Sequence, residues 1–229
     1  MRRKLVFLFL CAMPITAFAG QVTLQEGTAT FSQQENALLY SVDSAVDGVL
    51  SGNNGWAIQE RLPVCCVTNS QTAVWETATD INTTQLSFVM HQNVTIHHML
   101  GLFRLSVTSD DRAEFADGLN GEGIGGPDVP GANTPGDVSA NWTVLTNAVM
   151  SGPAGMTFSE RPDGSILVGG TPALGAYEIQ FTVNFNNITG IRLEAIQDAT
   201  SGLPFGGPGI DLNGNFVLSE LEVFAADPP

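Results

Sequence analysis

Positive charge is scarce in this sequence, and lysine is almost absent. The 229 residues include 8 lysines and arginines against 23 aspartates and glutamates, which gives a formal net charge of −15. Arg2, Arg3 and Lys4 stand before a short apolar run, so without this segment the charge falls by three to −18 and no lysine remains. Such a surface repels nucleic acids and anionic lipids, while it suits divalent cations and neutral ligands. We therefore expect no nucleic-acid partner.

Long hydrophobic runs are also missing after residue 19. Residues 1–19 have a basic start, an apolar run and small residues at Ala17 and Ala19, as in a secretory signal peptide cleaved after Ala19. The apolar run is shorter than the roughly 20 residues that span a bilayer. We therefore expect a secreted, extracellular or periplasmic protein without a membrane span. Residues 20–229 are expected to form a single domain.

Cysteine is rare, and after residue 19 only the adjacent Cys65 and Cys66 remain. Two cysteines do not make a disulfide framework. A bond between neighbours closes a strained ring, because adjacent Cα atoms lie closer than in usual disulfides. A strained disulfide and two thiols in a loop both stay open. No CxxC motif and no Cys/His zinc spacing occurs.

Catalytic motifs are missing as well. The sequence has no GxSxG elbow, no HExxH motif and no Walker loop. His91, His97 and His98 lie around one strand connection, where two imidazoles could bind a metal, although half-buried strand histidines are the more common case. A glycosidase carboxylate pair cannot be picked out among 23 acids. The sequence favours a protein that is not an enzyme, and a secreted hydrolase ranks last.

What the sequence does contain is a series of segments rich in Val, Ile, Thr and Phe, separated by Gly, Pro, Asn and Asp. The predicted strands are 22–33, 72–78, 84–92, 100–109, 141–150, 155–160, 165–170, 176–185, 188–197 and 215–224. The last segment alternates apolar and polar residues, with a phase change near Ser219–Glu220 that indicates a bulge. About ten strands without a βαβ pattern predict an all-β jelly-roll β-sandwich.

One turn-rich stretch, SAVDGVLSGNNGWAI at residues 44–58, holds a single acid, Asp47. Calcium prefers several oxygens from a tightly turned loop, together with one or two carboxylates, and this stretch can supply them. Alternatively, Asp47 only bonds the backbone of a turn. The local chemistry does not separate these two hypotheses. A second stretch, 211–222, has the ligand spacing of an EF-hand, but Phe216 stands where the sharp turn needs glycine.

Several motifs together resemble a known family. They are AVDG with GWAI, TAVWET, LGLFRLSVTSDD, ANWTVL, DGSIL, ITGIRLEAI and GGPGIDLNGNFVLSELEV. The sequence resembles the galactose-binding-like, or discoidin-type, domains of bacterial exported proteins, and the resemblance covers residues 29–224. It implies a jelly-roll sandwich that binds glycans, or in some members lipids or proteins, through loops at one end.

The resemblance also implies a structural calcium ion at the rim of the sandwich. Its ligands would be the carboxylates of Asp47 and Glu220 and the carbonyls of Ser44, Val49 and Ser219. An oxygen near Ser51–Asn54 would complete the set, and we assign this ligand to Asn54. Glu220 as a ligand would also account for the phase change in the last strand. We further expect this turn to stabilise the fold rather than to contact the ligand.

Glycan sites combine an exposed aromatic ring with polar groups that bind hydroxyls. Arg61, in the loop 59–71, and Arg112 are the candidate ligand-binding residues, and Phe205 is the one aromatic that stands exposed in a predicted loop. Trp75 and Trp142 lie in strand patterns typical of the core, and Trp56 is expected beneath the calcium turn. The favoured function is an exported, non-catalytic module that binds cell-surface or extracellular glycan. The alternative is a structural, matrix or cell-surface assembly protein without a sugar ligand.

Overall fold

The regular elements are β-strands and short 3-10 helices. The computed structural model describes residues 20–35, 38–59, 69–118, 122–123, 136–210 and 212–226. The strands are β1 (Gly20–Val22), β2 (Leu24–Ala29), β3 (Ser32–Glu35), β4 (Leu38–Tyr40), β5 (Trp56–Ala57), β6 (Gln71–Gln92), β7 (Leu102–Thr108), β8 (Glu122–Gly123), β9 (Thr143–Val144), β10 (Val149–Ser151), β11 (Met156–Glu160), β12 (Ile166–Gly170), β13 (Gly175–Ala195), β14 (Val217–Leu218) and β15 (Glu220–Ala226). The 3-10 helices are η1 (Val42–Ala45), η2 (Arg112–Glu114) and η3 (Pro204–Gly206). Within these ranges no helix has the length and apolar character that a membrane crossing requires.

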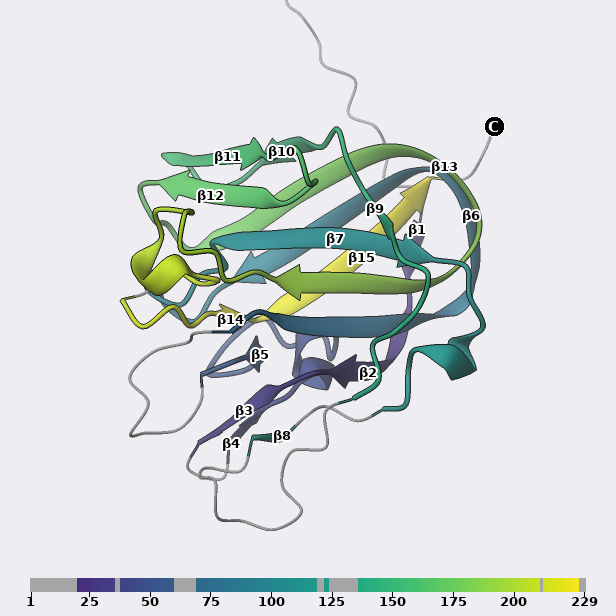
Figure 1. Ribbon diagram of the computed structural model, residues 1–229, viewed down its shortest axis with the longest axis horizontal. Helices are drawn as coiled ribbons and strands as arrows, with labels where there is room; N and C mark the ends of the chain where they lie inside the picture. The colour runs from purple at the N-terminus through teal and green to yellow at the C-terminus, as the bar shows by residue number, and fades with distance from the viewer. Residues whose placement is uncertain are drawn as a thin grey trace, which may run out of the picture.

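Ten strands form one antiparallel sheet in the order β1-β15-β6-β13-β7-β12-β11, with β2, β9 and β10 attached beside β6, β7 and β13 (Figure 1). β14 and β5 form a two-stranded sheet, and β4, β3 and β8 form a three-stranded one. The prediction of an all-β protein is confirmed.

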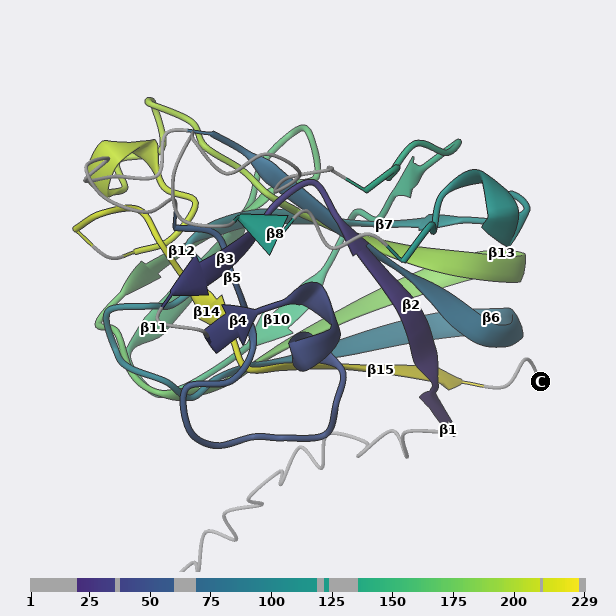
Figure 2. The same cartoon turned by 90° about the horizontal axis from the view of Figure 1, so that it is seen from below.

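Two long strands, β6 with 22 residues and β13 with 21, fold the large sheet over on itself. Residues 190–195 of β13 lie between the first part of β6 and β7, whereas residues 175–182 lie between the last part of β6 and β10. The pairing shifts register between these two halves, from Thr182 to Gly190. The halves therefore belong to two layers joined by the bend (Figures 1 and 2). This antiparallel, two-layer arrangement is the predicted jelly-roll β-sandwich.

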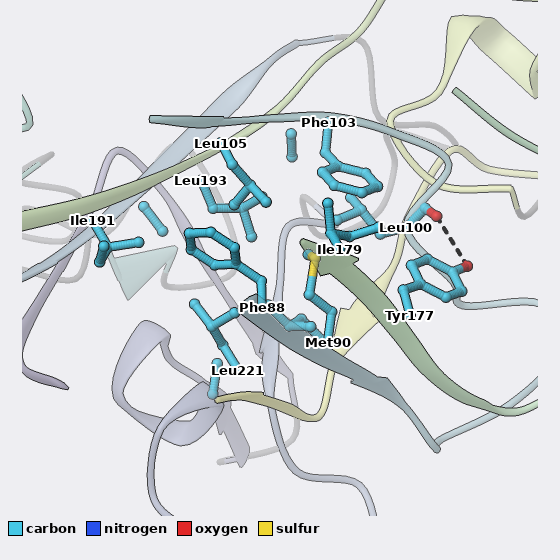
Figure 3. Close-up of a cluster of buried hydrophobic side chains, with 14 of the residues drawn as sticks. Phe88, Met90, Leu100, Phe103, Leu105, Tyr177, Ile179, Ile191, Leu193 and Leu221 are labelled. Atoms are coloured by element: carbon cyan, nitrogen blue, oxygen red, sulfur yellow. Dashed lines mark hydrogen bonds between the residues drawn. The ribbon is translucent and has the colours of Figure 1, made fainter. Parts of the chain in front are cut away.

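The core fills the space between the two layers. Figure 3 shows side chains that face one another from both layers, namely Phe88, Met90, Tyr177, Ile179 and Leu221 opposite Phe103, Leu105, Ile191 and Leu193. Each of these side chains is at most 2% exposed. The Tyr177 hydroxyl donates to the carbonyl of Leu100 at 3.1 Å, so this buried polar group is satisfied (Figure 3). Burial raises the pKa of the Tyr177 hydroxyl.

The observed strand boundaries differ from the predicted ones at the bend. Segments 72–78 and 84–92 are halves of β6, and 176–185 and 188–197 are halves of β13. The polar residues between the halves suggest turns, but backbone pairing continues through the bend as bulges.

Trp142 does not lie in the core, because most of the predicted strand 141–150 is irregular and only β9 and β10 form within it. Trp142 packs edge-on against Phe115 at 5.3 Å between ring centroids. The guanidinium of Arg192 lies 5.2 Å from the centroid of the Trp142 ring. Trp75, in contrast, is fully buried, as expected.

Candidate calcium and ligand site

The segment between η1 and β5 is a glycine-dependent turn that is seated against β14. Gly48, Gly52 and Gly55 have φ angles of 79°, 84° and 132°, which favour glycine. A Cβ atom on Gly55 would collide with the carbonyl of Leu218, so only glycine allows this close approach. The carboxylate of Asp47 accepts from the amide of Val49 at 2.8 Å. Asp47 thus forms the backbone turn that the simpler of the two sequence hypotheses describes.

The same turn brings four oxygen atoms around one point. The side-chain nitrogen of Asn54 lies 3.1 Å from both carboxylate oxygens of Asp47, 3.2 Å from the Ser44 carbonyl and 3.4 Å from the Val49 carbonyl. An amide group carries two hydrogens, so it cannot satisfy four acceptors. A set of carbonyl and carboxylate oxygens converging on one point suits a hard cation. Asn54 itself could be a ligand only if its amide turned to present Oδ1.

Glu220 approaches this turn from the first position of β15. Its two carboxylate oxygens accept from the amide of Gly48 at 3.2 and 3.1 Å, and the residue is only 5% exposed. Burial, together with the negative charges of Asp47 and Glu222, raises the pKa of Glu220, while the Gly48 hydrogen bond and His91 act in the opposite direction. The strand break before Glu220, between β14 and β15, lies at the predicted phase change.

The structure therefore brings most of the predicted calcium ligands into one neighbourhood. Ser44, Asp47, Val49 and Asn54 meet directly, and Glu220 binds the adjacent Gly48. Ser219 is buried beside them, with its amide donating to the His91 carbonyl at 2.9 Å. In the described part of the chain, no three His, Cys, Asp or Glu side chains group as metal ligands. An ion at this turn would rely on two carboxylates and on carbonyls.

The histidines hold other positions. The Nε2 atom of His91 lies 2.8 Å from the carboxylate of Glu222, on the neighbouring strand β15. His98 lines a small hollow described below. A metal held by two of these histidines stays a prediction.

A hollow of about 260 Å³ lies beside the turn, and we call it the amide pocket. Its lining consists of Gln33, Tyr40, Asn53, Gln59, Val94, Thr95, His98, Asn215 and Val217. None of these residues is Asp, Glu, Lys or Arg, although the chain as a whole is strongly acidic. The lining thus offers neutral polar groups, two aromatic rings and little charge.

Hydrogen bonds hold the amides of this pocket in place. Gln33 Oε1 accepts from the side chain of Asn215 and from the amide of Gln59, both at 3.2 Å. Asn215 Oδ1 accepts from the amide of Ile58 at 3.2 Å. Gln33 and Asn215 are 6% and 1% exposed, so their positions are set by buried contacts rather than by solvent. Polar groups held in this way are typical of preformed binding sites.

The turn at residues 44–54, which we call the calcium turn after the ion predicted there, borders the amide pocket. Asn53 lines the pocket, and the next residue, Asn54, contacts the converging oxygens of the turn. The expectation that this turn stabilises the fold rather than contacting the ligand stays a prediction. The pocket was missed in the sequence, because Gln33 and Asn215 are 182 positions apart and no local pattern brings them together.

Of the two predicted ligand-binding arginines, the structure describes only Arg112. Arg112 donates to the carbonyl of Thr77 at 2.9 Å and pairs with Asp80 at 2.9 Å, so it fastens η2 to β6. Arg61, like Cys65 and Cys66, lies outside the described residues. A ligand contact for Arg61 or Arg112 stays a prediction.

Phe205 is the exposed aromatic residue in the loop 199–214. Its side chain is 57% exposed and its φ angle is 51°, which is uncommon for a bulky residue. The carbonyl of Phe205 accepts from the side chain of Gln197 at 3.1 Å, and the amide of Gln197 donates to the Ser70 hydroxyl at 2.9 Å. The ring is therefore presented to solvent from a hydrogen-bonded loop.

Comparisons with known proteins found similar structures only. No protein-family model and no curated protein matches the chain. The chain is similar to a structure of two family 32 carbohydrate-binding modules of ZmpB from Clostridium perfringens, with a TM-score of 0.49 and 11% identity over 90% of this chain. It spans 37% of the length of that structure.

Two further similar structures cover single domains. One is the family 32 carbohydrate-binding module of NanJ from C. perfringens in complex with galactose, with a TM-score of 0.45, 12% identity and coverage of 89% of this chain and 98% of that one. The other is an F5/8 type C domain from Bacteroides fragilis, with a TM-score of 0.46, 9% identity and coverage of 91% and 99%. These are domains of the kind that the sequence motifs resemble.

Proposed function

We propose that this protein is an exported, non-catalytic module that binds a neutral glycan, with the amide pocket as its binding site. The pocket carries the proposal, because it combines fixed amide groups with the rings of Tyr40 and His98, and its described lining has no carboxylate or basic side chain. Amides both donate and accept hydrogen bonds, as sugar hydroxyls do. A hollow of about 260 Å³ suits one sugar unit better than a long polymer segment.

The proposal includes a structural calcium ion held by the turn at residues 44–54. The convergence of Asp47, Ser44 and Val49 oxygens supports it, as does the buried carboxylate of Glu220 on the adjacent amide. A bound calcium ion would neutralise the negative charge of the Asp47 and Glu220 carboxylates. The ligands would be those four residues, with Ser219 and Asn54 completing the set only after local rearrangement.

A glycan array with the chain 20–229 tests the proposed function, and it should include galactose because one similar structure contains that sugar. We expect binding to neutral glycans and none to nucleic acid. Replacing Asn53, which is exposed at the pocket, by alanine should weaken the affinity about tenfold, the size of one lost hydrogen bond to a ligand.

Two further variants serve as controls for this experiment. Asn184→Ala changes an exposed asparagine in the bend of β13 and should leave binding unchanged. Phe205→Ala tests the exposed ring; if it abolishes binding while Asn53→Ala does not, the site lies at η3 and the amide pocket is the wrong assignment. Silence across the array would favour a structural or assembly protein without a sugar ligand.

A further inference from the structure

One residue, Asn93, joins the calcium turn to the last strands of the sandwich. Its side-chain nitrogen donates to the carbonyl of Leu50, in the turn, at 3.0 Å. Its backbone amide donates to the hydroxyl of Ser219, the residue before Glu220, at 3.2 Å. Asn93 thus contacts both segments that contribute carboxylates to the proposed ion site.

Asn93 also begins the loop 93–98, which forms one wall of the amide pocket. Val94, Thr95 and His98 of this loop line the pocket, and Asn53 of the calcium turn lines it as well. The pocket therefore lies between two loops that the Asn93–Leu50 hydrogen bond holds together.

Both loops leave apolar side chains in solvent. Val49 and Leu50 in the turn are 43% and 45% exposed, and Ile96 in the facing loop is 44% exposed. Segments whose apolar side chains remain in solvent open more readily than the core, so individual hydrogen bonds govern their order. The position of Leu50 then depends on how firmly the turn itself is held.

We propose that an ion bound at the turn orders the loop 93–98 through Asn93, so that calcium controls the shape of the amide pocket and its affinity for ligand. This inference rests on the proposed ion site and on the proposed function of the pocket. An ion that gathers Asp47, Val49 and Glu220 restricts the turn and fixes the Leu50 carbonyl that accepts from Asn93. Two sites that stabilise the same ordered state are coupled, and each then strengthens binding at the other.

Hydrogen exchange, followed by mass spectrometry of the chain 20–229 in calcium and in chelator, tests this coupling without a glycan. In the wild type, calcium should slow exchange at least about fivefold in peptides covering 44–55 and also in peptides covering 93–98, the low end of usual coupling. In Asn93→Ala, the slowing should persist in 44–55 and disappear in 93–98. Asn93→Ser, which replaces the amide by a shorter hydroxyl that reaches less far toward Leu50, is a second variant, and Asn184→Ala is the matched control that should behave as wild type.

Three results would overturn the inference. Calcium could protect 44–55 alone in the wild type, it could protect 93–98 in both Asn93 variants, or it could change exchange in neither segment. Failure of the proposed glycan function is recognised separately, because a silent glycan array leaves the exchange pattern intact. Conversely, glycan binding that is equal in calcium and chelator, with protection confined to 44–55, leaves the proposed function standing and removes the coupling.

Discussion

Glu194 and Glu220 are both poorly exposed carboxylates on strands of the large sheet, but their surroundings differ. Glu194 is bound by Arg104 at 2.8 and 2.9 Å and by Arg192 at 3.0 Å. Glu220 is bound by one backbone amide, next to a second carboxylate, Asp47. Within the described part of the chain no side chain forms an ion pair with Glu220.

The difference appears in the pKa values of the charged groups at each site. The hydrogen bond to Glu194 raises the pKa of Arg104 above its usual value, whereas burial lowers the pKa of Arg192 against the attraction of Glu194. Burial is the largest cause of the raised pKa of Glu220, and the Gly48 hydrogen bond and His91 offset it only in part. Two arginines neutralise the first site, whereas no arginine among the described residues pairs with the second.

The largest expected effect on stability comes from replacing Glu194, which two arginines bind. Glu194→Ala leaves two arginines without their shared partner, and breaking such a poorly exposed pair should lower the free energy of unfolding by about 3 kcal/mol. Chemical denaturation measures the loss, which should be the same in calcium and in chelator. Glu178→Ala, at an exposed position of the same strand, is the control and should cost less than about 0.5 kcal/mol. A loss below about 1 kcal/mol for Glu194→Ala would contradict the interpretation.

The second-largest effect is on the stabilisation of the protein by calcium, which should require Glu220. In the wild type, free calcium at 100 times its Kd should raise the free energy of unfolding by about 2.7 kcal/mol. Glu220→Gln should remove this gain, and in chelator it should not destabilise the protein, because it removes an uncompensated buried charge. Since the pKa of Glu220 is raised on folding, the wild type in chelator should lose stability as the pH rises through the folded-state pKa.

Thermal unfolding in calcium and in chelator measures both parts of this prediction. Glu222→Gln is the matched control, because Glu222 lies two residues along β15 and binds His91 instead of the turn. It should retain the response to calcium. Equal unfolding midpoints of the wild type in calcium and in chelator would rule out a structural ion.

The smallest effect concerns a half-buried carboxylate, Asp198. The amide and hydroxyl of Thr200, followed by Arg161, lower the pKa of Asp198 to about 2. A depressed pKa stabilises the folded state above the unfolded-state value of 3.8, and this contribution disappears as the pH falls towards 2. The unfolding midpoint of the wild type should therefore fall more steeply between these pH values than that of Asp198→Asn. Parallel curves for the two proteins would contradict the assignment.

The comparison also separates what could be predicted from what could not. The strand segments follow from alternating apolar residues, and most of them pair as strands. Their merging into β6 and β13 could not be predicted, because pairing through bulges at the bend overrides the local preference of polar residues for turns. Arg61 and Arg112 were chosen as loop arginines, but Arg112 has intramolecular partners that only the folded chain supplies.

The candidate site also has one part that the sequence predicts and another that it does not. Gly48, Gly52 and Gly55 mark the turn in the sequence, since each allows a backbone conformation that other residues avoid. The approach of Glu220 to this turn, 172 positions from Gly48, was expected only from the family resemblance. The amide pocket had no counterpart in the sequence, because Gln33, Asn53, His98 and Asn215 come from four separate segments.

The sequence by itself determined the all-β class, the glycine-rich turn with Asp47 and the phase change before Glu220. These features depend on side-chain alternation and on backbone conformations of neighbouring residues, which are local properties. Only the tertiary structure decided that Glu194 pairs with arginines while Glu220 pairs with none among the described residues. It also decided which amides line the pocket. Such contacts depend on the register of strands far apart in the chain, and no local preference records that register.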